Sequence, residues 1–330
     1  MQPLVQASAL RPRLKGALRR LVARFTGSQL YFKAVNPIRG LWRSYGLIHG
    51  LRAFAYLCEV EVRARIHRHR LKVLSEEEVA ARRRSDTVFV FGSGASLNEI
   101  SDAEWHRIGQ HDVIGLNYFV RQRWVDVGFH YIRELELPFR RSGKYDAKAV
   151  VRSCRDFCDL VAGNGHYRET VLFLQHDFFA EIGKTIVGRK MLPPGQAVCF
   201  YKGLRRDGLK VAPPRDFGEG LPRQAGAIGG GVSIGRSFGW KRIVLVGVDL
   251  YDARYFWLPP DSVRGDVARK PSDRHGTVGR GIVEIMENWA TALRHDGISL
   301  EVYNPKSLLR PSLPQFRWDD GLPVHAAEGG

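Results

Sequence analysis

The fold is decided by the stretch Thr87-Val-Phe-Val-Phe91-Gly-Ser-Gly-Ala-Ser-Leu-Asn98, where an apolar run passes directly into a glycine turn. The run 87–91 is β-branched and aromatic, which is typical of a buried strand. Behind it, Gly92, Ser93, Gly94 and Ser96 are candidates for nucleotide binding, because glycines let backbone N–H groups approach a phosphate. The alternative is a tight strand-to-helix turn that binds no ligand.

Two common nucleotide sites are disfavoured by this pattern. A dinucleotide fingerprint needs a third glycine where Leu97 stands and an acidic residue where Asn117 stands. The Walker motif G-x-x-x-x-G-K-[ST] does not occur in the chain. An amide can both donate to and accept from a base or ribose, so Asn117 is a further candidate for nucleotide binding, with a plain turn residue as the alternative.

Six more short apolar runs follow along the chain, with helical segments between several of them. This alternation predicts an α/β fold of the Rossmann-like type, with a mainly parallel sheet covered by helices on both faces. The expected strands are 87–91, 112–116, 128–132, 170–174, 197–201, 242–248 and 299–303, and the expected helices are 97–108, 147–162, 232–238 and 281–294.

Charge separates the N-terminal region from the rest of the chain. Residues 1–85 hold 18 Lys and Arg against 5 Asp and Glu, while the formal net charge of the whole chain is +17. We therefore predict a basic helical region over 1–85, ending in a charged linker at 75–84, and a nucleotide-binding domain over 86–330. Such asymmetry points to an anionic partner surface.

Two amphipathic helices are expected in the basic region. The first covers 14–25, and they either pack on the main domain or lie on an anionic membrane surface. Nucleic acid is not expected as a partner, because the chain contains no recognisable nucleic-acid module. The second helix is expected to gather its apolar side chains on one face: Leu47, Ile48, Leu51, Phe54, Ala55, Cys58 and Val62.

Cysteine spacing and hydropathy limit the cellular compartments that are expected for this chain. The 4 cysteines form no C-x-x-C pair, which argues against a zinc ribbon and favours a reducing compartment. No apolar run reaches the ~18–20 residues that a membrane-spanning helix needs. We expect a cytoplasmic protein, attached peripherally to the inner face of the cytoplasmic membrane if its basic helices bind lipid.

Glycines and an arginine mark a second candidate loop, Arg223-Gln-Ala-Gly226-Ala-Ile-Gly229, which precedes a short helix. Adjacent glycines expose backbone donors, and Arg223 is suited to pair with a phosphate or a carboxylate. Gly226 and Gly229 are therefore nucleotide-binding candidates. The alternative is close packing of the helix on the sheet, with a surface arginine.

A third group of candidates follows the strongest strand. Tyr251 and Tyr255 could donate hydrogen bonds to a leaving phosphate, and Asp249 could organise their loop. His275 lies in a later loop and is a candidate general base, because histidine titrates near neutral pH. The alternatives are rings that cover the edge of the core and an ordinary exposed histidine.

Carboxylate spacing argues against a metal-dependent transferase. No D-x-D occurs in the chain, whereas a transferase that holds a divalent ion at a sugar diphosphate usually needs such a pair. A CMP donor has one phosphate, which arginine, tyrosine and backbone donors can bind. No metal and no cofactor are expected.

Six motifs in order resemble the bacterial sialyltransferases of glycosyltransferase family 42 and the related central domain of flagellin-modifying motility accessory proteins. They are VFGSGASLNEI, IGLNYF, Arg223 with its glycines, GWKRIVLVGVDLY, His275 and Asn304-Pro-Lys-Ser-Leu-Leu309, and they span residues 86–315. The resemblance implies a GT-A-variant sialyltransferase fold, inversion at the anomeric carbon without metal, and a homo-oligomer.

The resemblance also implies roles for individual residues. Ser93, Gly94, Ser96 and Asn117 would line the CMP site, and Arg223 would face the donor loop. Catalysis would fall to Tyr251 and Tyr255 at the departing phosphate and to His275 at the acceptor hydroxyl. The donor would carry sialic acid or another nonulosonic or Kdo-like sugar, and the acceptor would be a glycan, a glycolipid or a protein.

Two other functions stay open at this point. The G-x-G-x-S-L opening also resembles archaeal hydroxymethylpterin pyrophosphokinases, which would require ATP and magnesium. A non-catalytic membrane-associated scaffold on a degenerate transferase fold would bind no CMP. Nucleotide binding and metal dependence separate the three functions.

Overall fold

A computed structural model describes residues 36–135, 144–177, 180–204, 212–222, 225–263, 268 and 270–320. The chain forms two compact units, one of Met1–Glu59 with Leu137–Ala149 and one of Val60–Glu136 with Val150–Gly330. Residues 60–85, which charge alone groups with the N-terminal region, therefore lie in the larger unit. The expected helix at 14–25 lies outside the described residues.

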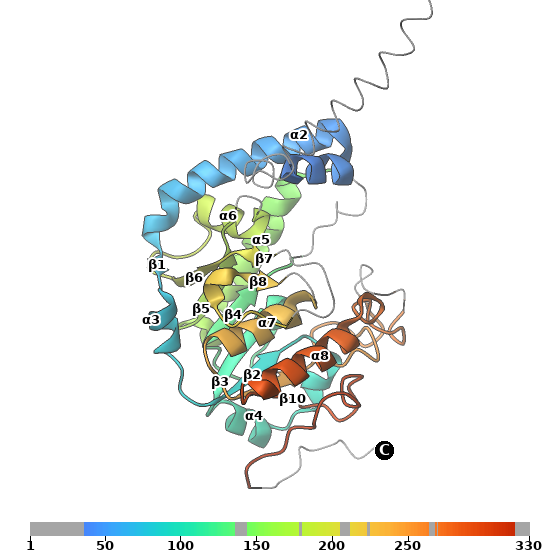
Figure 1. Ribbon diagram of the computed structural model, residues 1–330. Coiled ribbons are helices and arrows are strands. Elements are labelled where there is room, and N and C mark those ends of the chain that lie inside the picture. The colour runs from blue at the N-terminus through green and yellow to red at the C-terminus, as the bar shows by residue number, and fades with distance from the viewer. Residues whose placement is uncertain are drawn as a thin grey trace, which may run out of the picture. The chain divides into compact units, whose positions relative to one another are not determined.

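Eight parallel strands form the sheet of the larger unit, in the order β1-β6-β5-β4-β3-β2-β9-β10 (Figure 1). A second sheet pairs β7 with β8. The strands are β1 (Lys72–Val73), β2 (Thr87–Phe91), β3 (Asp112–Leu116), β4 (Phe129–Ile132), β5 (Val171–Gln175), β6 (Ala197–Tyr201), β7 (Gly203–Leu204), β8 (Leu221–Pro222), β9 (Arg242–Val246) and β10 (Ser299–Val302).

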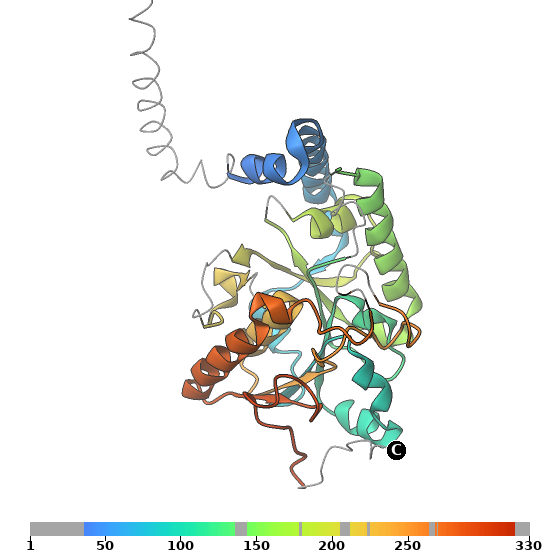
Figure 2. The ribbon, with the colours of Figure 1, turned by 90° about the vertical axis from the view of Figure 1, so that its right-hand side faces the viewer.

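Helices cover both faces of the large sheet, which confirms the predicted α/β class. Figure 2 shows the orange and red helices α7 and α8 on one side and the teal and green helices α4 and α5 on the other. The helices are α2 (Asn36–His67), α3 (Glu76–Ala80), α4 (Asp102–Ile108), α5 (Ala147–Gly163), α6 (Glu181–Gly188), α7 (Gly226–Ser237) and α8 (Ile282–His295), with short 3-10 turns that include η3 (Ala95–Glu99), η4 (Asn117–Arg121) and η8 (Val278–Arg280).

Strand β2 alternates its side chains between two cores. Val88 and Val90 join the cluster beneath α7 and α8. On the opposite face, the ring of Phe91 stacks on Phe119 with centroids 4.5 Å apart and on Trp105 at 5.5 Å. Both faces of a central strand in a parallel sheet are buried, which explains why the run 87–91 is continuously apolar.

Two expectations about the helices are corrected. The segment 75–84 is not a linker, because Ser75 and Glu78 form a reciprocal capping box that starts α3. Helix α7 begins at Gly226 rather than at 232, and the glycines in its first part face the sheet. A Cβ on Gly230 would lie 2.3 Å from Tyr131, and one on Gly231 would lie 2.6 Å from Val90. Low helix propensity hid this first part of α7 in the sequence.

Helix α2 also differs from expectation. Gly46 adopts a φ of 70° and interrupts the helix, a backbone conformation that favours glycine. The face predicted to be apolar is largely turned to solvent: Leu47, Ile48, Leu51 and Val62 are all more than half exposed. The side chains that α2 buries are Ala53, Tyr56, Leu57 and Val60. Of the two arrangements left open for the first face, packing on the main domain is therefore not observed at Leu47, Ile48, Leu51 and Val62.

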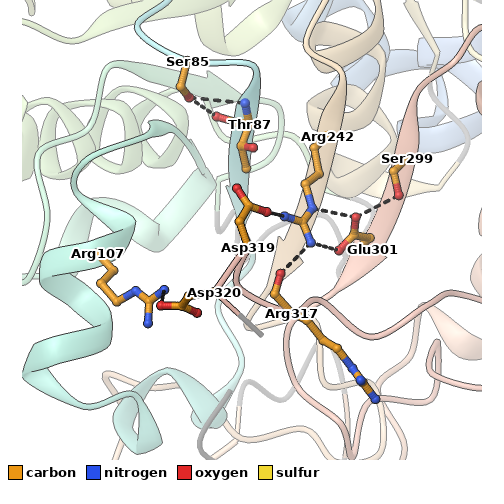
Figure 3. Close-up of polar contacts among 9 residues, drawn as sticks. All are labelled: Ser85, Thr87, Arg107, Arg242, Ser299, Glu301, Arg317, Asp319 and Asp320. Carbon is orange, nitrogen blue, oxygen red and sulfur yellow. Dashed lines mark hydrogen bonds and ion pairs between the residues drawn. The ribbon is translucent and has the colours of Figure 1, made fainter. Parts of the chain in front are cut away.

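The C-terminal segment is fastened to the start of β9 and β10 (Figure 3). Arg242 donates two hydrogen bonds to the Glu301 carboxylate, at 2.7 and 2.9 Å, and others to Asp319 at 3.0 Å and to the Arg317 carbonyl at 2.6 Å. Its guanidinium also lies 4.4 Å from the centre of the Phe316 ring. One arginine therefore joins two strands and the tail.

We expect Arg242→Ala to lower the free energy of unfolding by about 2 kcal/mol, because it leaves the buried Glu301 carboxylate without its charged partner. Asp319→Ala is the control in the same network, since the Asp319 side chain is 94% exposed and its pair is screened by water. Urea unfolding curves measure both. Equal losses in the two variants would contradict the role given to Arg242.

His130 is the most deeply buried titratable group near the carboxyl edge of the sheet. Its Nε2 lies 3.0 Å from the Asn117 carbonyl oxygen, and its Nδ1 lies 3.1 Å from the Tyr167 hydroxyl. Nε2–H therefore donates to the carbonyl, and Nδ1 accepts from the tyrosine. Burial lowers the pKa of His130 from 6.5 to about 3, so the folded protein keeps this imidazole neutral.

The lowered pKa of His130 predicts acid sensitivity. The unfolded chain takes up a proton at His130 below pH 6.5 and the folded chain does not, so its contribution to stability is present above pH 6.5 and lost as the pH falls toward 3. We expect the wild type to lose about 1.4 kcal/mol more per pH unit than His130→Gln in this window. Urea unfolding at several pH values tests this, with the exposed His106→Gln as control. Parallel curves for wild type and His130→Gln would contradict it.

Candidate functional site

The strand order reverses between β2 and β9. The chain runs from β2 through β3, β4, β5 and β6 in one direction across the sheet, whereas β9 leads to β10 in the other. In open parallel sheets, ligands bind outside the carboxyl ends of the strands at such a switch point. The loops that leave β2 and β9 contain most of the residues predicted from the sequence.

These two loops are joined by backbone contacts. The Gly92 N–H donates to the Val246 carbonyl and the Gly94 N–H to the Gly247 carbonyl, each at 2.8 Å. A Cβ on Gly92 would lie 2.5 Å from the Gly247 oxygen, and one on Gly94 would lie 2.3 Å from an Asp249 oxygen. The close approach of β9 thus requires both glycines, whether or not the turn binds a phosphate.

Asp249 organises the junction of the loops. Its carboxylate accepts hydrogen bonds from the Ser96 N–H at 3.0 Å, the Ser96 hydroxyl at 2.5 Å and the Asn304 side-chain amide at 2.8 Å. The side chain is buried, and burial raises its pKa above the ordinary value. Asp249 and Ser96 therefore bind each other and hold the two loops of the site together.

His275 lies beside Tyr255. The Tyr255 hydroxyl and His275 Nε2 are 3.1 Å apart, and the Thr277 hydroxyl contacts Nδ1 on the other side of the ring. The His275 N–H also donates to the Leu250 carbonyl at 3.1 Å, which ties its loop to the one after β9. The Thr277 backbone N–H donates to Nδ1 at 3.3 Å, so Nδ1 accepts in this arrangement and Nε2–H donates to the Tyr255 hydroxyl. To act as a general base at Nε2, the ring must take the other tautomer, with the proton on Nδ1.

Tyr251 and Tyr255 belong to the same loop but differ in their surroundings. Tyr255 is buried, and its backbone forms an antiparallel bridge with Gly94 of the glycine turn. Tyr251 is half-buried, and its pKa is raised to about 12, mainly by burial and next by the charge of Asp249. Tyr251 therefore keeps its proton at neutral pH and can donate a hydrogen bond.

Asn117 stands directly after β3 with a φ of 46°. Its side-chain oxygen accepts from the Arg133 N–H at 2.9 Å and from the Glu134 N–H at 3.1 Å. Asn117 thus connects the carboxyl ends of β3 and β4. Its side-chain oxygen thus acts as a turn residue, which was the alternative to nucleotide binding. Its amide nitrogen donates to no residue in the described part of the chain.

The second glycine loop is only partly visible. Arg223 lies outside the described residues. Gly226 begins α7 with a φ of 62°, and a Cβ placed on it would lie 3.8 Å from Thr277, so the start of α7 reaches the His275 loop. The Gly229 N–H is used within the helix, where it donates to the Ala225 carbonyl.

Sequence reasoning gave no role to two residues of the site, although Asn304 begins the sixth motif. Asn304 follows β10 in the motif NPKSLL, and its amide completes the ligation of Asp249. Thr277 follows His275 by two residues and fixes its ring. The available signal for Asn304 was a polar residue just beyond the carboxyl end of a parallel strand, the place where Asn117 was found.

Metal ligands do not gather at this edge. Within the described residues, no group of three or more His, Cys, Asp or Glu side chains is arranged to hold a metal ion. Asp252, in the loop after β9, is paired with Arg254 at 2.6 Å. The expectation that the chain works without metal or cofactor stays a prediction.

Fold and site together define an α/β protein with a doubly wound parallel sheet and a loop-lined edge at its switch point. No protein-family model matches the chain, and no curated protein matches its sequence. Among solved structures it is similar to the MAf glycosyltransferase from Magnetospirillum magneticum AMB-1, with a TM-score of 0.40 and 12% identity. The match covers 77% of this chain and 38% of that one, so this chain spans well under half the length of that protein.

Proposed function

We propose that the chain is an inverting glycosyltransferase that moves an acidic sugar from a CMP donor to a hydroxyl of a glycan, glycolipid or protein. The observation that carries the proposal is the hydrogen-bonded pair of Tyr255 and His275, which lies against the glycine turn at the switch point. The pair places a titratable base and a phenolic donor within 3.1 Å of each other. The six ordered sequence motifs supply the choice of donor.

The nucleotide would occupy the edge formed by the loops after β2 and β3. Ser93, Gly94 and Asn117 stand there, and Asn117 offers an amide nitrogen suited to a base or ribose. Ser96 would support the turn through Asp249. Arg223 and the start of α7 at Gly226 would add positive potential for the phosphate and for the carboxylate of the sugar.

The reaction follows from this placement. The acceptor oxygen attacks the anomeric carbon from the face opposite CMP, a new C–O bond forms, and the bond from that carbon to the phosphate oxygen breaks. When the Tyr255 hydroxyl turns from His275 Nε2 to the phosphate of the bound donor, that nitrogen is open to take the hydroxyl proton of the acceptor. Charge builds on the departing phosphate, where the protons of Tyr251 and Tyr255 would stabilise it. No step requires a metal or a cofactor.

Calorimetric titration with CMP tests the proposal, with UMP, GDP and ATP as comparators, first in EDTA and then with magnesium. We expect CMP to bind selectively in EDTA, and release of CMP from CMP-sialic acid or a related donor to depend on an added acceptor. Preference for ATP with magnesium would instead support a pyrophosphokinase. Binding of none of the nucleotides would support a non-catalytic scaffold.

A further inference from the structure

Helix α2 leaves four large apolar side chains in solvent within ten residues. Trp42 is 56% exposed, Leu47 53%, Ile48 64% and Leu51 59%. We call these four residues the α2 patch. The neighbouring side chains Ala53, Tyr56 and Leu57 are buried, and within the smaller unit the ring of Tyr145 packs on Tyr45 at 5.4 Å and on Tyr56 at 6.1 Å. The patch spans the interruption at Gly46, with Trp42 before it and Leu47, Ile48 and Leu51 after it. The neighbouring side chains Tyr45 and Tyr56 already have packing partners.

Exposed apolar side chains on this scale mark a contact surface. Single exposed leucines are ordinary in soluble proteins, whereas a cluster with a tryptophan is typical of an interaction site. Leu47, Ile48 and Leu51 belong to the apolar side of the helix that was expected either to pack on the main domain or to lie on a membrane surface. Their exposure favours the second arrangement.

The sequence that contains the patch is basic. Residues 1–58 contain 10 Lys and Arg and no Asp or Glu, and those within the described part of this range are Arg39, Arg43 and Arg52. Arg43 and Arg52 are exposed beside the patch. A surface that combines tryptophan and aliphatic side chains with arginines, and has no acidic residue to repel anionic headgroups, matches the interface of an anionic bilayer. A protein partner would not require acidic residues to be missing over so long a stretch.

We propose that the α2 patch docks the protein on an anionic lipid surface, with the four apolar side chains in the headgroup boundary and the arginines on lipid phosphates. None of the described helices is both long and apolar enough to cross a bilayer. This inference does not depend on the proposed transferase activity.

Cosedimentation of the full chain with phosphatidylcholine vesicles, with and without phosphatidylglycerol, tests the proposal. We expect binding only when phosphatidylglycerol is present, and loss of binding at high salt. Ile48→Glu with Leu51→Glu should weaken binding at least about tenfold, because two inserted side chains become charged. Arg43→Glu with Arg52→Glu should weaken it by a similar factor.

A charge-matched control separates docking from net charge. Arg168→Glu with Lys241→Glu makes the same change of charge at exposed positions of the larger unit, and this variant should bind vesicles like the wild type. Circular dichroism and urea unfolding show that each variant is folded. Wild-type vesicle binding by both patch variants would overturn the proposal. The proposal would also be overturned if the patch variants differed from the wild type in oligomeric state without lipid, because the patch would then be an interface between copies of the chain.

Discussion

His275→Ala is expected to slow sugar transfer by about 10²–10⁴-fold, the usual contribution of a positioned general base. The ring is oriented from both sides, by Tyr255 at Nε2 and by Thr277 at Nδ1, so alanine removes the base without removing its neighbours. Transfer is followed as release of CMP from a CMP-sugar donor, and CMP affinity is followed by calorimetry. We expect the affinity to stay within about twofold, because the base acts on the acceptor and not on the nucleotide.

The matched control is His295→Ala, an exposed histidine at the end of α8 and away from the loops of the site. It should transfer sugar at the wild-type rate. Parallel losses of CMP affinity and turnover in His275→Ala would assign His275 a structural role. An unchanged rate would remove it from the mechanism and would leave Tyr251 and Tyr255 as the groups to test.

Asp249→Ala is expected to lower the free energy of unfolding by about 3 kcal/mol and CMP affinity by at least about tenfold. Three hydrogen-bond donors at Ser96 and Asn304 would lose their acceptor inside the protein, and each unsatisfied buried donor costs about 1–3 kcal/mol, with incomplete additivity. The glycine turn would then lose its side-chain contact with the loop after β9. The edge at which the nucleotide is proposed to bind would lose its shape as a result.

Asp252→Ala provides the comparison within the same loop. Asp252 is also buried, but the partners of its carboxylate are the backbone and guanidinium of Arg254, a side chain that is 42% exposed. Water can replace that partner, so we expect a loss below about 1 kcal/mol and normal CMP affinity. Urea unfolding and calorimetry measure both variants. Equal effects of the two substitutions would contradict a special role for Asp249.

Local pattern was sufficient for most of the sheet. Strands β2, β3 and β6 begin and end where the apolar runs do. Strands β4, β9 and β10 differ from the expected ranges by one or two residues at one end, and β5 is shifted by one residue. The helices were harder to predict. Glycines hid the start of α7, and a five-residue helix at Glu76–Ala80 was too short to show a periodic pattern, although Ser75 and Glu78 had marked its cap.

The site was predicted in parts and not as a whole. Asn117, Tyr255 and His275 could be selected because each follows a strand end or lies in a polar loop with suitable chemistry. Their assembly could not be predicted from spacing, since Ser96 and Asp249 are separated by 153 positions in the chain. Asn304 was passed over for the same reason, because its importance appears only when its contact with Asp249 is known.

The class of fold, the seven longer strands and the chemistry available at their ends follow from the sequence alone, because strand formation and burial follow from short apolar runs between polar turns. Tertiary contacts set the rest: β2 lies beside β9, Asp249 fastens the two loops, and Leu47, Ile48 and Leu51 face solvent. Periodicity shows that a helix has an apolar side, but which side is covered depends on partners that are distant along the chain.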